Sequence, residues 1–546
     1  MKKIFSILVF AAILAISFVS CKKYLDVNSD PVNPQTPDPS SVFPTQLAGI
    51  PRGLQFDARY CARFIQNLLS ENTSSAANVN FDRMGYTASS DANGDIWRQA
   101  YYGLGANLEY IIGKGIQAQQ WDYVGAALVL KGMMFQYATD YHGEIIFSEA
   151  FKENQAFFKY DDQETVYKGI DSILRLGISY LLNTEYNPNT SRLSKTDYVY
   201  GGSNAKWIKL AYGLLARNFH RLTNKSTYQP DSVIANCDRS LAVIDDDFLI
   251  PFDAQKNDDA NFFGTYRNNL TVYRQSNYIV KLMNGTILAG KDTLPNRDPR
   301  IRHMLTVSSD SIYRGVDPGT GDPFWGITTG VNARKRVPVP FADSIYTNPS
   351  VSAFQNTARK YVFGDKVVFP VMTASEIQFM KAEAAFRKGD KGTALTAYTN
   401  GINLHFDFIN RTTFPRGNLP LYTTNPITAT ERTNYMNSPN VKKTTTELGL
   451  SDIMLQKYIA LWGWGFFETF VDMRRYHWVD VDPVTGLKVY AGFDLPSPLA
   501  PENLNKPVYR VRPRFNSEYV WNRDALLIIG GLNGDYHTYE TWMSKP

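Results

Sequence analysis

The chain has 546 residues, and 57 lysines and arginines against 52 aspartates and glutamates give it a formal net charge of +5. Hydrophobic residues make up 44% and charged residues 20%, a globular composition that excludes a largely disordered chain. Because the net charge is small and the basic clusters at 334–336 and 510–514 are isolated, no nucleic-acid partner is predicted. We interpret the alternating Arg510, Arg512 and Arg514 as the solvated face of a short strand.

Residues 1–20 have the proportions of a secretory signal. Two lysines precede an apolar run over 4–19, which is too short to cross a bilayer comfortably as a helix. Ser20 and Cys21 end this run and resemble the lipobox of bacterial lipoproteins, in which the thiol receives a diacylglycerol and the new amine receives an acyl chain such as palmitate. We expect Cys21 to be lipidated and to begin the mature chain. The alternative is a short uncleaved membrane helix.

Residues 21–44 are predicted to form a tether, because Pro31, Pro34, Pro37 and Pro39, with polar residues between them, favour extended backbone. Asp26, Asn28 and Asp30 have the alternating spacing that opens a calcium-binding loop, but Pro31 stands where that loop requires glycine. No metal site is therefore predicted. No later apolar segment approaches membrane length, so we expect the rest of the chain to be held at a membrane surface by lipid alone.

Residues 45–546 are predicted to form a mainly α-helical body, since apolar residues recur there at helical spacing. In the sharpest segment, Thr373 and Glu376 form a capping box, Gly389 ends the helix, and Asp390 caps the next helix. The product is a helical hairpin, and about four such pairs can be assembled along the chain. We predict a degenerate tetratricopeptide-like repeat fold.

Two long insertions, over about 248–370 and 414–444, are rich in residues that break helices. Aromatic residues persist there without helical spacing. A flat ring offers a large apolar face to a sugar ring or a peptide side chain, and a loop places that ring at the surface. We therefore expect the insertions to form a ligand-binding face. Trp97 and Trp207 are excluded from it, because their helical spacing predicts core positions.

Trp325 is the first candidate for a ligand contact, because it lies in the bent segment GDPFWG, where no amphipathic pattern assigns it to a helix. The alternative is that it anchors its loop to the scaffold. The remaining candidates are aromatic residues outside clear helical patterns: Tyr266, Tyr273, Tyr313, Phe81 and Tyr86.

No catalytic site, metal site or cofactor is predicted. The six histidines have no two members at the spacing that places two ligands on one helix face. Ser203 fits an S-x-x-K pattern but directly precedes a helix, so we interpret it as a helix cap. Asp140 and Glu144 are candidate carboxylates for glycoside hydrolysis, but we expect them to cap and solvate a helix end. Cys61 and Cys237 are expected to be buried free thiols.

Several segments resemble the SusD/RagB family of nutrient-binding outer-membrane lipoproteins. In chain order they are CKKYLDVNSDP, LKGMMFQYATDYHGEIIFSEAF, YDDQETVYKGI, DYVYGGSNAKWIKLAYGLLAR, DPRI, FPVMTASEIQFMKAEAAFRKGD and LQKYIALWGWGFFETFVDMRR. The resemblance implies four tetratricopeptide-like hairpins, irregular insertions that form a ligand-binding face, and no enzymatic activity. It also implies a partner, a SusC-like TonB-dependent transporter.

The implied function is capture of a nutrient oligomer, an oligosaccharide or a peptide, by a lipid-anchored protein that faces the outside of the outer membrane. The family's binding residues vary between members, so none is carried over to this chain. Two alternatives stay open: a helical-repeat scaffold that holds other proteins together, and a helical glycoside hydrolase that uses Asp140 or Glu144.

Overall fold

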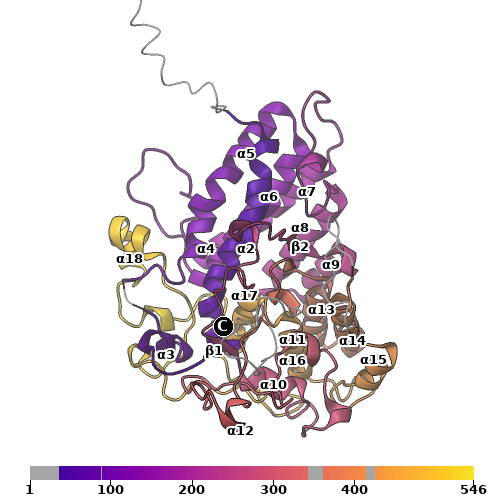
Figure 1. Cartoon of the computed structure of the whole chain (residues 1–546). Coiled ribbons are helices and arrows are strands. Elements are labelled where there is room, and N and C mark those ends of the chain that lie inside the picture. Colours follow the sequence, from indigo (N-terminus) through magenta and orange to yellow (C-terminus); the bar gives the residue numbers. More distant parts are fainter. Residues whose placement is uncertain (1–35, 88, 342–360, 413–424) are drawn as a thin grey trace, which may run out of the picture.

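Helices dominate the structure (Figure 1). This computed structural model describes residues 36–87, 89–341, 361–412 and 425–546. The predicted signal peptide, Cys21 and most of the predicted tether lie outside these ranges. Within them, no helix is long and apolar enough to cross a membrane.

The scaffold consists of helix pairs that pack against each other in chain order. The pairs are α5 (Gly105–Ala118) with α6 (Trp121–His142), α7 (Gln163–Leu182) with α8 (Asn204–His220), α13 (Ala374–Lys388) with α14 (Lys391–Ile409), and α16 (Leu450–Leu461) with α17 (Phe466–Arg475). Figure 1 shows the purple pairs above the orange ones. Between them, α9 (Pro230–Arg239) packs on both α8 and α13. The predicted mainly α, tetratricopeptide-like fold is confirmed.

Capping residues begin and end the predicted hairpin at α13 and α14. The Thr373 side chain accepts a hydrogen bond from the backbone N–H of Glu376, and Gly389 ends α13 in the left-handed region, with φ at 88°. Asp390 then caps α14 through its side chain. The Glu376 carboxylate turns inward and accepts from Arg217 (Nε to Oε1, 2.6 Å), so only the Thr373 half of the predicted capping box forms.

The first scaffold helix, α2 (Pro39–Phe64), begins before the predicted end of the tether at residue 44. The Asp38 carboxylate accepts from the backbone N–H of Ser40 (2.9 Å) and caps the helix. Pro39 takes the first helical position, where its fixed φ suits a helix and its missing N–H costs nothing. Proline therefore opens a helix here, whereas the sequence interpretation extended the tether through it.

The predicted insertion over 248–370 is irregular in its described part, and two short antiparallel strand pairs tie it down. These pairs are β1 (Leu68–Ser70) with β3 (Tyr273–Gln275), and β2 (Phe248–Pro251) with β4 (Val368–Met372). Its helices are short: α10 (Asn277–Met283), α11 (Ile301–Met304) and α12 (Gly330–Ala333). The second predicted insertion contains α15 (Ala429–Met436), where Thr428 and Glu431 form a capping box.

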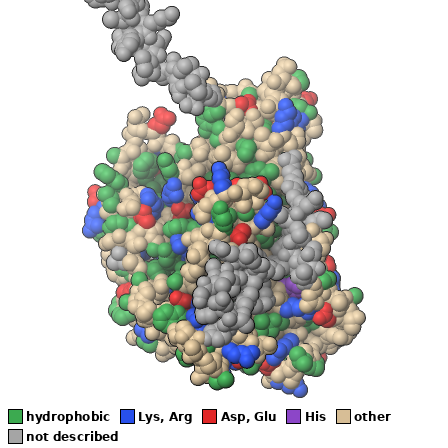
Figure 2. Space-filling view, viewed as in Figure 1, with side chains coloured by type: hydrophobic (Ala, Val, Ile, Leu, Met, Phe, Trp, Pro, Cys, Tyr) green, Lys and Arg blue, Asp and Glu red, His purple; other side chains and the backbone are tan. Residues whose placement is uncertain are grey.

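Three further short helices lie beside the scaffold: α3 (Ala76–Asp82), α4 (Asp95–Arg98) and α18 (Arg523–Ile528). Figure 2 shows hydrophobic side chains gathered on the left of the molecule, over α18 and α4. Ser203 caps α8 as predicted, and Cys61 and Cys237 are buried free thiols as predicted.

Buried ion pairs connect the scaffold helices. Arg221 donates from Nη2 to Asp140 (2.8 Å) and to Glu468 (2.5 Å), and Arg475 donates from Nη1 to Glu383 (2.7 Å). All five side chains are almost fully buried. Because a buried charge without its partner costs several kcal/mol, these pairs fix how α6, α8, α13 and α17 pack together.

Asp140 and Glu144 do not solvate a helix end, and that expectation was wrong. Asp140 is buried in α6, where it accepts hydrogen bonds from Arg221 and from the hydroxyl of Tyr167 (2.7 Å). Glu144 pairs with Arg510. Neither partner arginine is near these carboxylates in the sequence, so the local pattern could not indicate them. Both carboxylates have structural partners.

Candidate functional site

The segment that carries Arg510, Arg512 and Arg514 is not a strand with a solvated face. Arg510 is buried: its Nε donates to the carbonyl oxygen of Tyr539 (2.8 Å) and its Nη1 to the hydroxyl of Tyr536 (2.9 Å). The prediction was wrong because the following C-terminal segment folds back over these arginines and supplies acceptors. The arginines line hollows instead.

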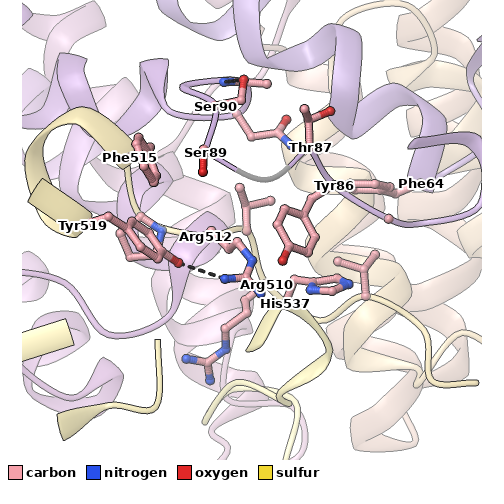
Figure 3. A pocket seen from close by; sticks show the side chains of 16 residues that line it. Phe64, Tyr86, Thr87, Ser89, Ser90, Arg510, Arg512, Phe515, Tyr519 and His537 are labelled. Atoms are coloured by element: carbon pink, nitrogen blue, oxygen red, sulfur yellow. Dashed lines mark hydrogen bonds between the residues drawn. The ribbon is translucent and has the colours of Figure 1, made fainter. Parts of the chain in front are cut away.

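The first hollow has a volume of about 200 Å³ and lies between the loop that follows α3 and the segment 508–519 (Figure 3). The guanidinium carbon of Arg512 lies 3.9 Å from the ring centre of Tyr86, and Nη1 of Arg512 lies 3.0 Å from the hydroxyl oxygen of Tyr519. The ring of Phe515 stacks on Tyr519, with 5.4 Å between ring centres. The other polar lining residues include Thr87, Ser89, Ser90, Asn93, Arg510 and His537.

The charge of the first hollow comes from its arginines. Burial, and then the neighbouring Arg512, lower the pKa of His537 to about 3, so this histidine is neutral at physiological pH. Burial raises the pKa of Tyr519, which keeps its hydroxyl protonated. Arg512 is held by the carbonyl oxygens of Asn533 and Gly534, both 2.7 Å from Nη2. The hollow therefore presents a fixed cation beside aromatic rings and hydroxyl groups.

The second hollow, of about 600 Å³, lies beside α2. Phe56 and Tyr60 are four residues apart, so they lie on one face of α2 and both line the hollow. Phe262 joins them from the insertion, and Arg59 lies over both Phe56 (4.3 Å to the ring centre) and Phe262 (5.1 Å). Further charged lining residues are Arg52, Asp91, Asp95, Arg98, Arg267 and Arg514.

The two hollows are neighbours. Ser90 and Ala92 line both of them, so both open beside the same loop. Together they combine ring faces with arginine, carboxylate and hydroxyl groups, the mixture that binds a ligand with both apolar and hydroxylated faces. No group of three or more potential metal ligands occurs among the residues that the structure describes.

One of the predicted ligand contacts lines these hollows, and two are buried. Tyr86 lines the first hollow. Phe81 is buried behind Tyr60 (4.7 Å between ring centres), and Tyr273 is buried under Arg63 (4.6 Å from guanidinium carbon to ring centre). Burial gives Phe81 and Tyr273 no free face for a ligand, so their prediction as contacts does not fit this structure.

The other three predicted contacts lie outside the lining of both hollows. Tyr266 is 55% exposed and precedes Arg267, which lines the second hollow. Trp325 is 43% exposed, and Tyr313 is half-buried against the core. These three remain proposed contacts.

The sequence reasoning missed Phe56, Tyr60, Arg512 and Tyr519. Helical spacing was taken as a sign of the core, yet Phe56 and Tyr60 are only half-buried. Arg52 and Arg59 on the same helix were the available signal, because arginines beside aromatic residues are unusual on a face that packs into a core. Nothing local indicated that Arg512 meets Tyr86, far away in the sequence.

Comparisons with known proteins agree with this architecture. The SusD-like family, described as "Starch-binding associating with outer membrane", matches residues 38–488. A search of curated proteins gives no match. Among solved structures, a chitin-binding protein is 20% identical with a TM-score of 0.66, and the alignment covers 93% of this chain and 100% of that one.

Two other solved structures have TM-scores of 0.62 and are 19% identical. A SusD/RagB family protein from Bacteroides thetaiotaomicron aligns over 92% of this chain and 98% of its own, and a chitin-binding SusD homologue from Flavobacterium johnsoniae over 93% and 98%. These likenesses show a shared fold. Because the family match spans most of the chain, the protein belongs to the SusD-like family of binding proteins, whose members are not enzymes.

Proposed function

We propose that the protein captures an oligosaccharide at the outer membrane and passes it to a SusC-like TonB-dependent transporter. The observation that carries this proposal is the pair of adjoining hollows, in which Tyr86, Tyr60 and Phe56 offer ring faces beside arginines and hydroxyl groups. A sugar ring has an apolar face that packs on an aromatic ring and hydroxyl groups that need polar partners. A peptide ligand is the second candidate.

Chitin oligosaccharides are the first ligands to test, because two proteins of the same fold are named as chitin-binding. The mature protein is titrated calorimetrically with chitin and starch oligosaccharides and with a mixed peptide library. We expect at least one oligosaccharide series to bind with saturation. Binding of peptides alone would show that the ligand class is peptide and not oligosaccharide. Binding of neither class would favour the protein-scaffold alternative.

Variants then locate the site. Tyr86→Ala and Tyr60→Ala each remove a ring from one hollow, and we expect affinity for the oligosaccharide to fall about tenfold, since an aromatic contact contributes about 0.5–1.5 kcal/mol beyond its burial. Trp521→Ala is the matched control, because Trp521 is 80% exposed and lines neither hollow. Equal loss in all three variants would argue against this site.

The proposed partner is tested separately. The native protein is purified from detergent-solubilised membranes, and we expect a TonB-dependent β-barrel transporter to accompany it. Its proposed location, anchored by lipid at the outer membrane and facing outward, is tested by labelling intact cells with a reagent that does not cross membranes. In the purification from membranes, recovery of soluble proteins without a β-barrel transporter would favour the scaffold alternative.

A further inference from the structure

A third hollow, of about 570 Å³, lies next to the C-terminal segment and is distinct in character from the two described above. Its walls include five aromatic residues, Trp97, Tyr101, Tyr102, Phe151 and Phe158. It lies in the region where Figure 2 shows hydrophobic side chains gathered over α18 and α4. The volume and the apolar walls suit a small molecule. The walls are more apolar than those of the first two hollows, so a ligand with a larger apolar body is indicated.

Two π-helical segments form parts of its wall. These are η1 (Gln99–Gly103), between α4 and α5, and η8 (Phe515–Tyr519), before α18. They are the π-helical segments in the described part of the chain, and they contribute Tyr101 and Glu518 among others. π-Helical turns are rare and are frequently found at functional sites. Both π-helical segments line the same hollow. This is a second indication of a binding site, independent of the volume of the hollow.

Glu518 supplies a buried carboxylate to this wall, with 4% of its surface exposed. Its oxygens accept hydrogen bonds from the indole N–H of Trp97 (3.2 Å), the hydroxyl of Tyr160 (2.5 Å) and the side-chain amide of Asn522 (3.0 Å). Burial, and then the charge of Glu518, raise the pKa of Tyr160 well above its usual value, so Tyr160 stays a donor. All three hydrogen-bond partners are uncharged.

The two arginines of this hollow already have carboxylate partners. Arg98 pairs with Asp95 (3.3 Å), and Arg514 pairs with Asp91 (2.7 Å). Each arginine is therefore offset by its own carboxylate, whereas the hydrogen bonds described for Glu518 come from uncharged groups. A carboxylate in a poorly hydrated site favours a cation beside it, since the attraction is screened less there than in water.

We propose that this hollow binds an organic cation with an apolar body, whose ammonium group lies between the aromatic rings and the carboxylate of Glu518. Aromatic faces attract cations through the ring quadrupole. Tyr102 is 76% exposed and Tyr101 is half-buried, so these two tyrosines offer the ring faces, while the buried Trp97 closes the wall behind them. The apolar body of the ligand then packs on Phe151 and Phe158.

The test uses two probes that differ in charge, 2-phenylethylammonium and 2-phenylethanol, titrated calorimetrically into the mature protein. We expect the ammonium to bind at least about tenfold more tightly than the alcohol. Ala106 lines the hollow and is exposed, so Ala106→Trp fills the hollow without disturbing the core and should abolish binding. Asn107→Trp places the same ring on the neighbouring exposed position of α5, outside the lining, and should leave binding unchanged.

Glu518→Gln tests the carboxylate, and we expect it to remove the preference for the ammonium over the alcohol. If that variant does not fold, the comparison of Ala106→Trp with Asn107→Trp still decides the site. Equal affinity of the wild-type protein for both probes, or unchanged binding in Ala106→Trp, would overturn the proposal.

Discussion

The guanidinium of Arg512 contacts two tyrosines that are far apart in the sequence. Its carbon lies 3.9 Å from the ring centre of Tyr86, and its Nη1 lies 3.0 Å from the hydroxyl oxygen of Tyr519. Tyr86 follows α3, and Tyr519 lies in η8 near the other end of the chain. One arginine therefore holds together the two walls of the first hollow (Figure 3).

Arg512→Lys should weaken oligosaccharide binding about tenfold. Lysine keeps the charge, but it lacks the planar fork that stacks on Tyr86 and reaches two carbonyl oxygens at once. The measurement is calorimetric titration with the ligand found for the wild-type protein. Arg523→Lys, at an exposed position of α18, is the control and should change nothing. Unchanged affinity in Arg512→Lys would remove Arg512 from the site.

Glu468→Gln should destabilise the protein by about 3–5 kcal/mol, because it leaves the buried Arg221 with half of its carboxylate partners. The free energy of unfolding is measured by urea titration. Glu164→Gln breaks an exposed pair with Lys168 and should leave the free energy of unfolding nearly unchanged. Similar losses in the two variants would show that the buried pairs do not fix the packing of the scaffold.

His142→Gln should flatten the fall in stability on the acid side. Burial lowers the pKa of His142 from 6.5 to about 4. As the pH falls from 6.5 to 4, the unfolded chain binds a proton that the folded chain refuses, so stability is lost over that window by up to about 1.4 kcal/mol per pH unit. Urea unfolding at several pH values measures the slope. An unchanged slope would contradict the assignment.

His477→Gln should act on the alkaline side instead. The hydrogen bond to Asp480 raises the pKa of His477 to about 9, so its stabilising effect is complete below pH 6.5 and is lost as the pH rises through 9. The variant should therefore lose stability at neutral pH and show less further loss toward pH 9. The same urea series measures both effects, and a variant that behaves like His142→Gln would refute this distinction.

Trp325→Ala should weaken binding of long oligosaccharides more than that of short ones. The loop that carries Trp325 packs on the segment before Tyr86, where the backbone N–H of Asp322 donates to the carbonyl oxygen of Glu71 (2.8 Å). We expect a long ligand that extends beyond the hollows to contact Trp325, and truncation should then cost about tenfold in affinity. Titration is paired with a melting temperature: unchanged affinity with a lowered melting temperature would show a loop anchor.

Cys21→Ala should release the protein from membranes or leave it as an unprocessed precursor, because the proposed acyl chains provide the stable anchor. Fractionation of cells and the mass of the mature chain measure the two outcomes. A processed Cys21→Ala protein that still partitions into membranes would disprove the anchor.

Local signals were predictable, and contacts between distant segments were not. The hairpin at α13 and α14 could be predicted because Thr373, Gly389 and Asp390 act on their own neighbours. The environments of Asp140 and Arg510 could not, because each depends on a partner far along the chain.

The candidate site illustrates the same limit. Tyr86 was accessible to sequence reasoning as an aromatic residue in a loop, whereas Tyr60 shares its helical spacing with true core residues. A half-buried ring that faces a hollow and a buried ring that faces another helix follow the same period, so periodicity alone cannot separate them. The π-helical turns leave no periodic mark that a sequence pattern reveals.

The first hollow is built from residues near 85–93 and from residues 508–537, which are more than 410 residues apart in the chain. The helical hairpins form contacts between residues that are near in sequence, so they can fold during synthesis. The first hollow has only one wall until the C-terminal segment has been synthesised. A chain cut shortly before Val508 would lack the second wall of this hollow. Ligand binding in the first hollow therefore depends on the C-terminal segment as well as on the helical scaffold.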